Sequence, residues 1–362
     1  DGVNTPRRQD AVNRRLMQEE KDHHHVRCFE KGREFILNNR NNDNWYLQLE
    51  YFDPHEPFFV PERFKRWYTD EPTDTDWPEY RPYSEDERDS IRQFRINYAA
   101  LVSMCDEYLG KILDLFDEYD LWKDTMLIVN TDHGFMLGEK GFVGKNYMPV
   151  YDELANIPFF IHDPARPRAD GTRVPALAQT PDIPCTLLDF FSVPRGEHMT
   201  GKALQPLLDG AGAIHDYILY GYFGMHVNMT DGRYTYMRCA RTADNRPLYQ
   251  YTLMPWHIQK PMMIPEIAQA DDTLFRGFEF ARHTPLLKIP VDERYDKKRY
   301  YRYSSHMQYG SLVFDRQRDP QQLSPIKDAQ LEASLAGVMA RLMRENEAPA
   351  EQFVRLGLED RD

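Results

Sequence analysis

Two polar side chains stand directly after an apolar run, where they could hold a metal ion or move a proton. Asp132 and His133 follow residues 125–130, a short hydrophobic segment typical of a buried strand. A carboxylate beside an imidazole can ligate a divalent cation or act as an acid–base pair. By itself, the Asp-His-Gly run is as typical of a structural cap at a strand end as of an active site. Lys145 ends the loop that follows. That loop is rich in glycine, which lets a backbone turn tightly and pass close to a ligand: Gly134, Gly138, Gly141 and Gly144.

A further histidine follows another β-prone run. Residues 46–52 predict a strand that stops at Asp53, and His55 comes next, between Pro54 and Pro57. The two proline rings stiffen the loop and fix the direction of the histidine. Such a histidine, taken alone, is more often a structural hydrogen-bonding group than a catalyst.

The elements around these residues indicate an α/β fold with a mostly parallel central sheet flanked by helices. Apolar residues recur at helical spacing in 28–37 and, most regularly, in 91–117. Residues 125–130 and 156–162 predict buried strands, and strands that alternate with helices favour a parallel sheet. Ligands of such sheets collect beyond the carboxyl ends of the strands. Residues 60–90, rich in proline, acids and aromatics, predict a long surface excursion.

Past about residue 213 the sequence changes to alternating patterns and turns. This change divides the chain into two predicted domains, 1–212 and 213–362. Residues 217–223 and 234–238 predict antiparallel strands joined through an Asp-Gly turn. Residues 331–344 predict a helix near the end of the chain. We therefore expect a smaller C-terminal α+β subdomain that contains an antiparallel sheet.

Composition excludes several classes of partner. The 362 residues include 45 Lys and Arg against 58 Asp and Glu, a formal net charge of -13. Such a balance argues against a broad nucleic-acid surface. No apolar run reaches the roughly 20 residues of a membrane helix, so we expect no membrane partner. Four separated cysteines indicate free thiols, which weakly favours the cytoplasm. A periplasmic or secreted location stays open, because the chain begins at Asp1 without a leader.

Several segments, in order along nearly the whole chain, resemble the sulfatase family of the alkaline-phosphatase superfamily. Residues 131–145, TDHGFMLGEKGFVGK, are similar to the family's (S/T)-D-H-G-x-x-L-G-(D/E)-H-G-x-x-x-K segment. Asp53 to Pro57 resembles its P-H-x-P element. Further matches are 98–113, 151–153 with 157–159, 182–189 with 201–204, and 312–315 with 318–320.

The resemblance implies roles for the residues already named. Asp132 and His133 would be metal ligands, or His133 a group at the metal's edge. Lys145 would contact the oxygens of a sulfate or phosphate group and the leaving oxygen, and His55 would bind the same anion or protonate the leaving group. His257 would be a substrate contact or a packing residue. The implied cation is Ca²⁺, with Mn²⁺ or Zn²⁺ as alternatives because imidazole suits those ions.

The chain departs from the family pattern in two places. Lys140 stands where many members have a second histidine. More important, no C/S-x-P-x-R element, whose Cys or Ser becomes the formylglycine nucleophile, occurs in the sequence. Two protein ligands are also too few for a hard cation. We therefore expect the nucleophile and an acidic metal pair in sequence upstream of Asp1.

The predicted function is hydrolysis of a sulfate monoester, small-molecule or saccharide, at a divalent-metal site. A phosphonate monoester or phosphodiester hydrolase of the same superfamily is one alternative. A catalytically inactive truncated or processed chain is another. Oligomeric state and natural substrate are left open by the sequence.

One histidine run is set aside at this stage. His23, His24 and His25 lie in a polar leader, and adjacent histidines are not expected to face one ion together. We therefore predict no metal site there.

Overall fold

The computed structural model describes residues 6–257, 260–295 and 306–359. The chain forms two compact units, and each is described by itself. The first comprises Asp1–Val129, Phe135–Gly144 and Phe159–Arg168, and the second Asn130–Gly134, Lys145–Pro158 and Ala169–Asp362. A division into domains at 212/213 stays a prediction. Within the described ranges, no helix has the length and apolar character needed to span a bilayer.

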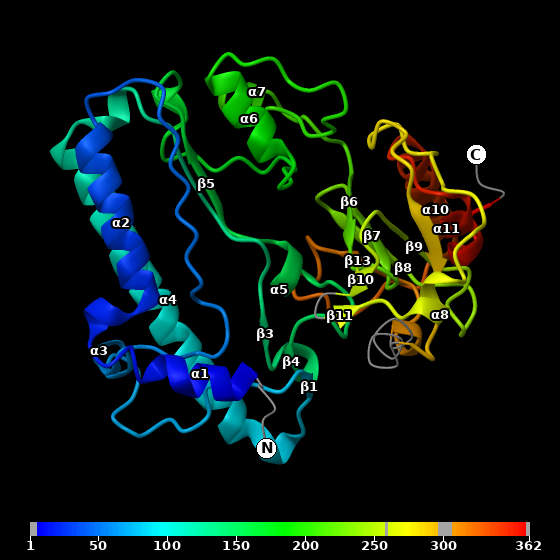
Figure 1. Ribbon diagram of the computed structural model, residues 1–362, viewed down its shortest axis with the longest axis horizontal. Helices are drawn as coiled ribbons and strands as arrows, with labels where there is room; N and C mark the ends of the chain where they lie inside the picture. The colour runs from blue at the N-terminus through cyan, green and yellow to red at the C-terminus, as the bar shows by residue number, and fades with distance from the viewer. Residues whose placement is uncertain (1–5, 258–259, 296–305, 360–362) are drawn as a thin grey trace. The chain divides into compact units, whose positions relative to one another are not determined.

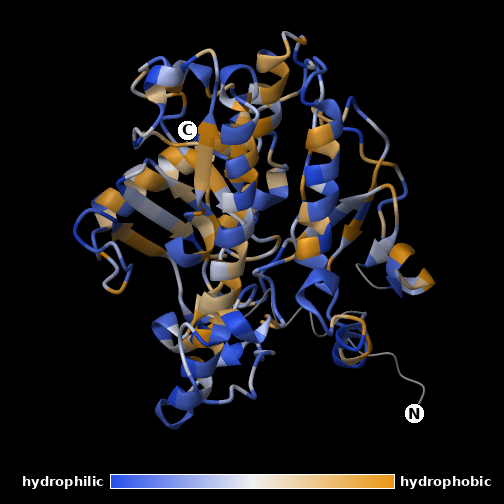
Figure 2. Cartoon of the chain, turned by 90° about the vertical axis from the view of Figure 1, so that its left-hand side faces the viewer, coloured by the Kyte–Doolittle hydropathy of each residue, from blue (hydrophilic) through white to orange (hydrophobic). Residues whose placement is uncertain are grey.

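Two long helices dominate the first unit. α2 (His24–Asn39) and α4 (Arg88–Glu118) lie side by side (Figure 1). Their apolar faces meet, with the rings of Phe29 and Tyr108 at 5.2 Å between centroids. Hydrophobic and hydrophilic residues alternate along the helices (Figure 2), as amphipathic segments require. Both helices were predicted from their spacing, and the structure confirms them.

Short strands and helices complete this unit. β2 (Leu127–Asn130), whose last residue belongs to the second unit, pairs with β5 (Phe159–His162), and both strands were predicted. A second, antiparallel sheet has the order β1-β4-β3. The remaining elements are α1 (Pro6–Arg14), α3 (Glu62–Lys65), β1 (Arg81–Pro82), β3 (Met136–Leu137) and β4 (Phe142–Gly144).

Two predictions for this region are wrong. Residues 46–52 alternate between half-buried and exposed positions as a strand would, but no strand is formed there because no neighbouring strand pairs with the run in the described part of the chain. Residues 60–90 are not merely a surface excursion. Phe64 of α3 is fully buried and joins the core formed with α4.

The second unit is built on a four-stranded antiparallel sheet of order β13-β8-β7-β6. Helix α10 (Ala329–Glu345) packs against it and, with α11 (Ala350–Leu356), closes a hydrophobic core. The sheet's strands are β6 (Ile218–Gly221), β7 (Val227–Thr230), β8 (Tyr234–Arg238) and β13 (Leu312–Asp315).

The second unit also contains two pairs of short strands and several short helices. β9 (Tyr249–Thr252) pairs with β12 (Leu287–Pro290), and β10 (Trp256–His257) pairs with β11 (Lys260–Pro261), both antiparallel. The helices are α5 (Asp152–Ala155), α6 (Asp182–Phe190), α7 (Gln205–Leu208) and α8 (Ile264–Ile267). The predicted antiparallel C-terminal part and its terminal helix are thus confirmed.

Strand β7 is a finding that the sequence did not predict. The Asp-Gly turn joins β7 to β8, and β6 pairs with the far edge of β7, so the two predicted strands are not direct neighbours. Polar Asn228 and Thr230 of β7 are buried. The strand therefore lacks the apolar–polar alternation by which half-buried strands are recognised.

The four cysteines are free, as predicted. Cys185 and Cys239 are buried, and Cys28 and Cys105 are half-buried.

Candidate active site

Asp132 and His133 lie two and three residues beyond the end of β2, and their side chains face each other. The Nε2 atom of His133 lies 3.4 Å from Oδ2 of Asp132. The other ring nitrogen, Nδ1, donates to the carbonyl of Gly134 at 2.9 Å. Because Nδ1 carries the proton in this arrangement, Nε2 presents a lone pair on the side of the carboxylate. The pair can therefore offer one nitrogen and one oxygen to the same cation.

The Asp132 carboxylate is oriented by its own loop. Its Oδ1 atom accepts the backbone N–H of His133 at 2.8 Å and the hydroxyl of Thr131 at 3.4 Å. The side chain is 81% exposed, so Oδ2 faces solvent as well as the imidazole. An ion could reach this oxygen without displacing packed groups.

Gly134 anchors the loop to helix α5. Its backbone N–H donates to the carbonyl of Leu154 at 3.0 Å. A Cβ at residue 134 would lie 1.9 Å from the carbonyl oxygen of Glu153, so only glycine fits. Helix α5 is held in turn, because Asp152 accepts from Arg316 at 2.6 Å and its N–H donates to Gln322 at 2.8 Å.

These two side chains fit a divalent cation as part of a ligand set. Ca²⁺ takes six to eight oxygen ligands, whereas Zn²⁺ and Mn²⁺ accept imidazole readily. In the described residues, the one cluster of three or more His, Cys, Asp or Glu groups at metal-binding spacing lies elsewhere, at His23, His24 and Asp53. Asp132 and His133 can thus offer two of the ligands that such a cation needs.

Lys145 directly follows β4 and is buried, with 7% of its surface exposed. The hairpin of β3 and β4 that precedes it depends on glycine. Gly144 has φ of +122°, and a Cβ there would lie 2.8 Å from the ring of Tyr80. Gly138 has φ of +100°. These glycines therefore let the β3–β4 hairpin turn tightly, and the close passage of its backbone to a ligand stays a prediction.

His55 belongs to the first unit, whereas Asp132, His133 and Lys145 belong to the second. Its Nδ1 atom donates to the carbonyl of Glu56 at 2.6 Å and lies 3.4 Å from Oε2 of that residue. The ring also packs at 4.7 Å against Phe52. These contacts orient the imidazole. That the flanking prolines fix the direction of the ring stays a prediction.

The buried Glu56 is a group that the sequence reasoning missed. It is 7% exposed, and it accepts a hydrogen bond from the hydroxyl of Tyr80. Its position between His55 and a proline is visible in the sequence. The partner Tyr80 lies far along the chain, and no local pattern points to it.

The structure also describes the surroundings of three further residues, of which His257 and Lys140 were named from the sequence. His257 is buried, with Nε2 at 3.0 Å from Oε2 of Glu266, which favours the packing role among its two predicted roles. Lys140 lies in a turn with φ of 53°. Lys202, outside the candidate site, donates to the carbonyl of Ile214 at 2.6 Å.

Comparison of the chain with models of known protein families identifies one that covers most of the residues described above. The model of the Sulfatase family matches residues 3–193, more than half of the chain. The chain belongs to the sulfatase family. A second model, of the C-terminal part of N-sulphoglucosamine sulphohydrolase, matches residues 138–282. The predicted membership in the sulfatase family of the alkaline-phosphatase superfamily is therefore confirmed.

Curated relatives match at low identity. The choline-sulfatase of Rhizobium meliloti is 25% identical over 284 residues, which cover 68% of this chain and 53% of the relative. The multifunctional alkaline phosphatase superfamily protein PehA of Trinickia caryophylli is 24% identical over 201 residues, 48% of this chain and 39% of the relative. This sulfatase chain spans about half the length, or less, of the curated relatives it matches.

A solved structure agrees on the fold. The phosphonate monoester hydrolase of Agrobacterium radiobacter superposes with a TM-score of 0.59 at 17% identity, over 91% of this chain and 62% of that one. Identity this low supports the fold and nothing finer. The predicted α/β class of the alkaline-phosphatase type is thereby confirmed.

Proposed function

We propose that the protein hydrolyses a sulfate monoester, O- or N-linked, and that Asp132, His133, Lys145 and His55 take part in the reaction. The observation that carries the proposal is the facing pair at the end of β2, with 3.4 Å between Nε2 of His133 and Oδ2 of Asp132. Membership in the sulfatase family supports it. A strand-end cap alone gives no reason for an aspartate that is 81% exposed to face an imidazole.

Each residue has a role in the proposed reaction. Asp132 and His133 would hold the divalent cation, which supplies positive charge next to a sulfate oxygen. Lys145 would neutralise charge that develops on the sulfate and on the leaving oxygen. Lys145 is 7% exposed, and electrostatic stabilisation is stronger where water is excluded. His55 would hydrogen-bond the sulfate or protonate the leaving oxygen, the role that the family resemblance implies for it.

Calcium is the proposed cation, and Mn²⁺ or Zn²⁺ is the alternative that the imidazole of His133 favours. The nucleophile in this proposal is a formylglycine. The 362 residues contain no C/S-x-P-x-R element. In this proposal they therefore include groups that bind the cation, the sulfate and the leaving oxygen, but not the nucleophile. Activity should therefore be measured on protein expressed from the complete natural reading frame.

A sulfated saccharide is the proposed substrate class. Support comes from the matched C-terminal model of N-sulphoglucosamine sulphohydrolase and from the N-acetylglucosamine-6-O-sulfatase of Bacteroides thetaiotaomicron, which is 31% identical over 121 residues, 33% of this chain and 21% of the relative. A small-molecule sulfate ester remains the alternative.

Parallel assays separate the proposal from its rivals. An aryl sulfate and an aryl phosphonate monoester would be offered at equal concentration, with Ca²⁺, Mn²⁺ and Zn²⁺ in separate arms. We expect a higher kcat/KM for the sulfate ester. A higher kcat/KM for the phosphonate ester would favour the hydrolase alternative, and no turnover of either ester in any arm would favour an inactive chain.

A further inference from the structure

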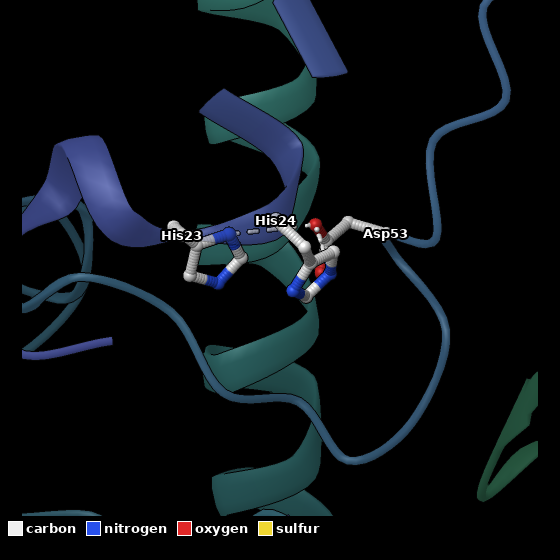
Figure 3. A group of neighbouring side chains, drawn as sticks. All are labelled: His23, His24 and Asp53. Carbon is white, nitrogen blue, oxygen red and sulfur yellow. Dashed lines mark ion pairs between the residues drawn. The ribbon is translucent and has the colours of Figure 1, made fainter. Parts of the chain in front are cut away.

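A group of metal-binding side chains lies in the first unit, where the sequence predicted none. The N-terminus of α2 and the loop before His55 bring together His23, His24 and Asp53 (Figure 3). One ligand atom from each of the three lies within 4.8 Å of the others. The sequence interpretation considered the histidines alone, and it did not include the aspartate that folding places beside them.

The separations suit one small cation. Asp53 Oδ2 lies 3.0 Å from Nε2 of His24 and 3.8 Å from Nδ1 of His23. Two ligands that each bind zinc at about 2.0–2.1 Å in tetrahedral geometry lie about 3.3 Å apart. The observed distances bracket that value. The two imidazole nitrogens also lie within 4.8 Å of each other, so an ion between the three atoms requires only local side-chain adjustment.

Adjacent histidines can face one ion here because the chain changes conformation between them. His23 precedes the helix with extended backbone angles, φ of -63° and ψ of 136°, and His24 is the first helical residue. The two rings consequently stack, with centroids 4.3 Å apart, instead of pointing to different sides. The expectation that neighbouring histidines diverge holds within a regular helix and fails at its first turn.

The polar atoms of the cluster are buried and poorly satisfied. His23 is 2% exposed and Asp53 is 7% exposed. Oδ2 of Asp53 and Nε2 of His24 are buried without a hydrogen-bond partner of good geometry. Leaving such groups unpaired costs free energy, and a cation would satisfy both. His24 itself is 40% exposed, which leaves a path for an ion and a position for a water ligand.

Hydrogen bonds around the cluster prepare it for a cation. Nε2 of His23 lies 3.3 Å from the carbonyl of Phe59 and donates to it, so Nδ1 keeps its lone pair. Metal-bound histidines commonly have such a second contact. Nδ1 currently accepts a long hydrogen bond of 3.4 Å from the N–H of His25, which metal binding would replace.

His25 is a positioning residue for Asp53. Its ring is 2% exposed and stacks at 4.2 Å on Tyr51, with Nδ1 at 3.2 Å from Oδ2 of Asp53. A single carboxylate oxygen thus faces three imidazoles.

We propose that His23, His24 and Asp53 bind one zinc ion, with water as the fourth ligand. Two imidazoles and one carboxylate around an open position form a donor set that suits Zn²⁺. The ion would join the N-terminus of α2 to the segment that carries His55, two residues after Asp53. Its role is structural, because it fastens two segments of the same unit.

Zinc binding itself tests the proposal. The purified full chain would be stripped with a chelator and titrated with Zn²⁺ by calorimetry at pH 7, in a background in which Asp132 and His133 are both alanine. We expect one equivalent of zinc to bind. His24→Ala, chosen because this residue is half-exposed, and Asp53→Asn should each lose that equivalent, whereas His198→Ala should keep it.

His25→Ala should weaken zinc binding by about 10- to 100-fold, as expected for a residue that orients a ligand. Co²⁺ in place of Zn²⁺ should give the visible absorption of a tetrahedral site, which His24→Ala should abolish. Circular dichroism would confirm that the variants are folded. The proposal is overturned if folded, stripped protein binds no zinc, or if His24→Ala and Asp53→Asn bind it as tightly as the parent. Because the background lacks Asp132 and His133, neither result depends on the proposed function.

Discussion

The Cα of Gly134 approaches the backbone of Glu153 so closely that a Cβ on residue 134 would lie 1.9 Å from the carbonyl oxygen of residue 153. This contact fixes the loop that carries Asp132 and His133 against helix α5. The orientation of the facing pair therefore depends on a residue that itself performs no chemistry.

Replacement of Gly134 by alanine should displace that loop. The new methyl group would collide with backbone, which cannot move aside as a flexible side chain can, so we expect a loss of about 1–3 kcal/mol in the free energy of unfolding. Gly110→Ala is the matched control, because nothing lies within 4 Å of a Cβ at that position in α4. It should stabilise the chain by up to about 1 kcal/mol. Urea unfolding would measure both, and equal stability of the two variants would contradict the close contact.

Lys145→Met should reduce turnover without unfolding the chain. Methionine nearly preserves the volume of the buried side chain and removes the charge proposed to stabilise the transition state. Loss of one such group typically lowers kcat by about 10²–10³. Lys202→Met serves as the control, since the Lys202 ammonium is bound to a backbone carbonyl. Steady-state kinetics with an aryl sulfate would distinguish the two, and equal effects would remove Lys145 from the site.

The free energy of unfolding should fall as the pH is lowered, because His226 is buried in its neutral form. This residue is 1% exposed, its Nε2 donates to Gly310 at 2.8 Å, and burial lowers its pKa from 6.5 to about 4. Between these values the unfolded chain binds more protons, so the free energy of unfolding decreases with acid by up to about 1.4 kcal/mol per pH unit.

The measurement is urea unfolding at several pH values between about 6.5 and 4. His226→Gln can still donate to Gly310 but cannot titrate, so its stability should depend less on pH than that of the parent. His198→Gln should retain the parent's dependence. If His226→Gln showed the same slope as the parent, another group would be responsible.

The amphipathic helices were predictable from the sequence because one face of each is buried, so apolar residues recur at the helical period. The α4 stripe, which includes Phe94, Leu101 and Tyr108, repeats at the helical period and is buried in the structure. Strand β7 escaped prediction because Asn228 is buried and the alternation is lost. Residues 46–52 show the reverse case. The run is β-prone in sequence and alternates in burial, but it forms no strand because pairing depends on a neighbour that no local pattern encodes.

Candidate site residues were predictable where they follow one another in the chain. Asp132 and His133 are adjacent, so their facing geometry follows from one loop. The cluster of His23, His24 and Asp53 joins two segments separated by helix α2, and the contact between Glu56 and Tyr80 spans a comparable distance in sequence. Such pairs are set by tertiary packing, which sequence spacing does not reveal.

The central claim is that Asp132 and His133 hold the cation of a sulfate ester hydrolase. The most direct test is the hydrolysis of an aryl sulfate by protein from the complete natural reading frame, compared with its Asp132→Ala variant. Asp124→Ala, at another exposed aspartate, is the control. The account predicts that Asp132→Ala loses both turnover and the divalent cation, while Asp124→Ala retains both. Undiminished turnover in Asp132→Ala would contradict it.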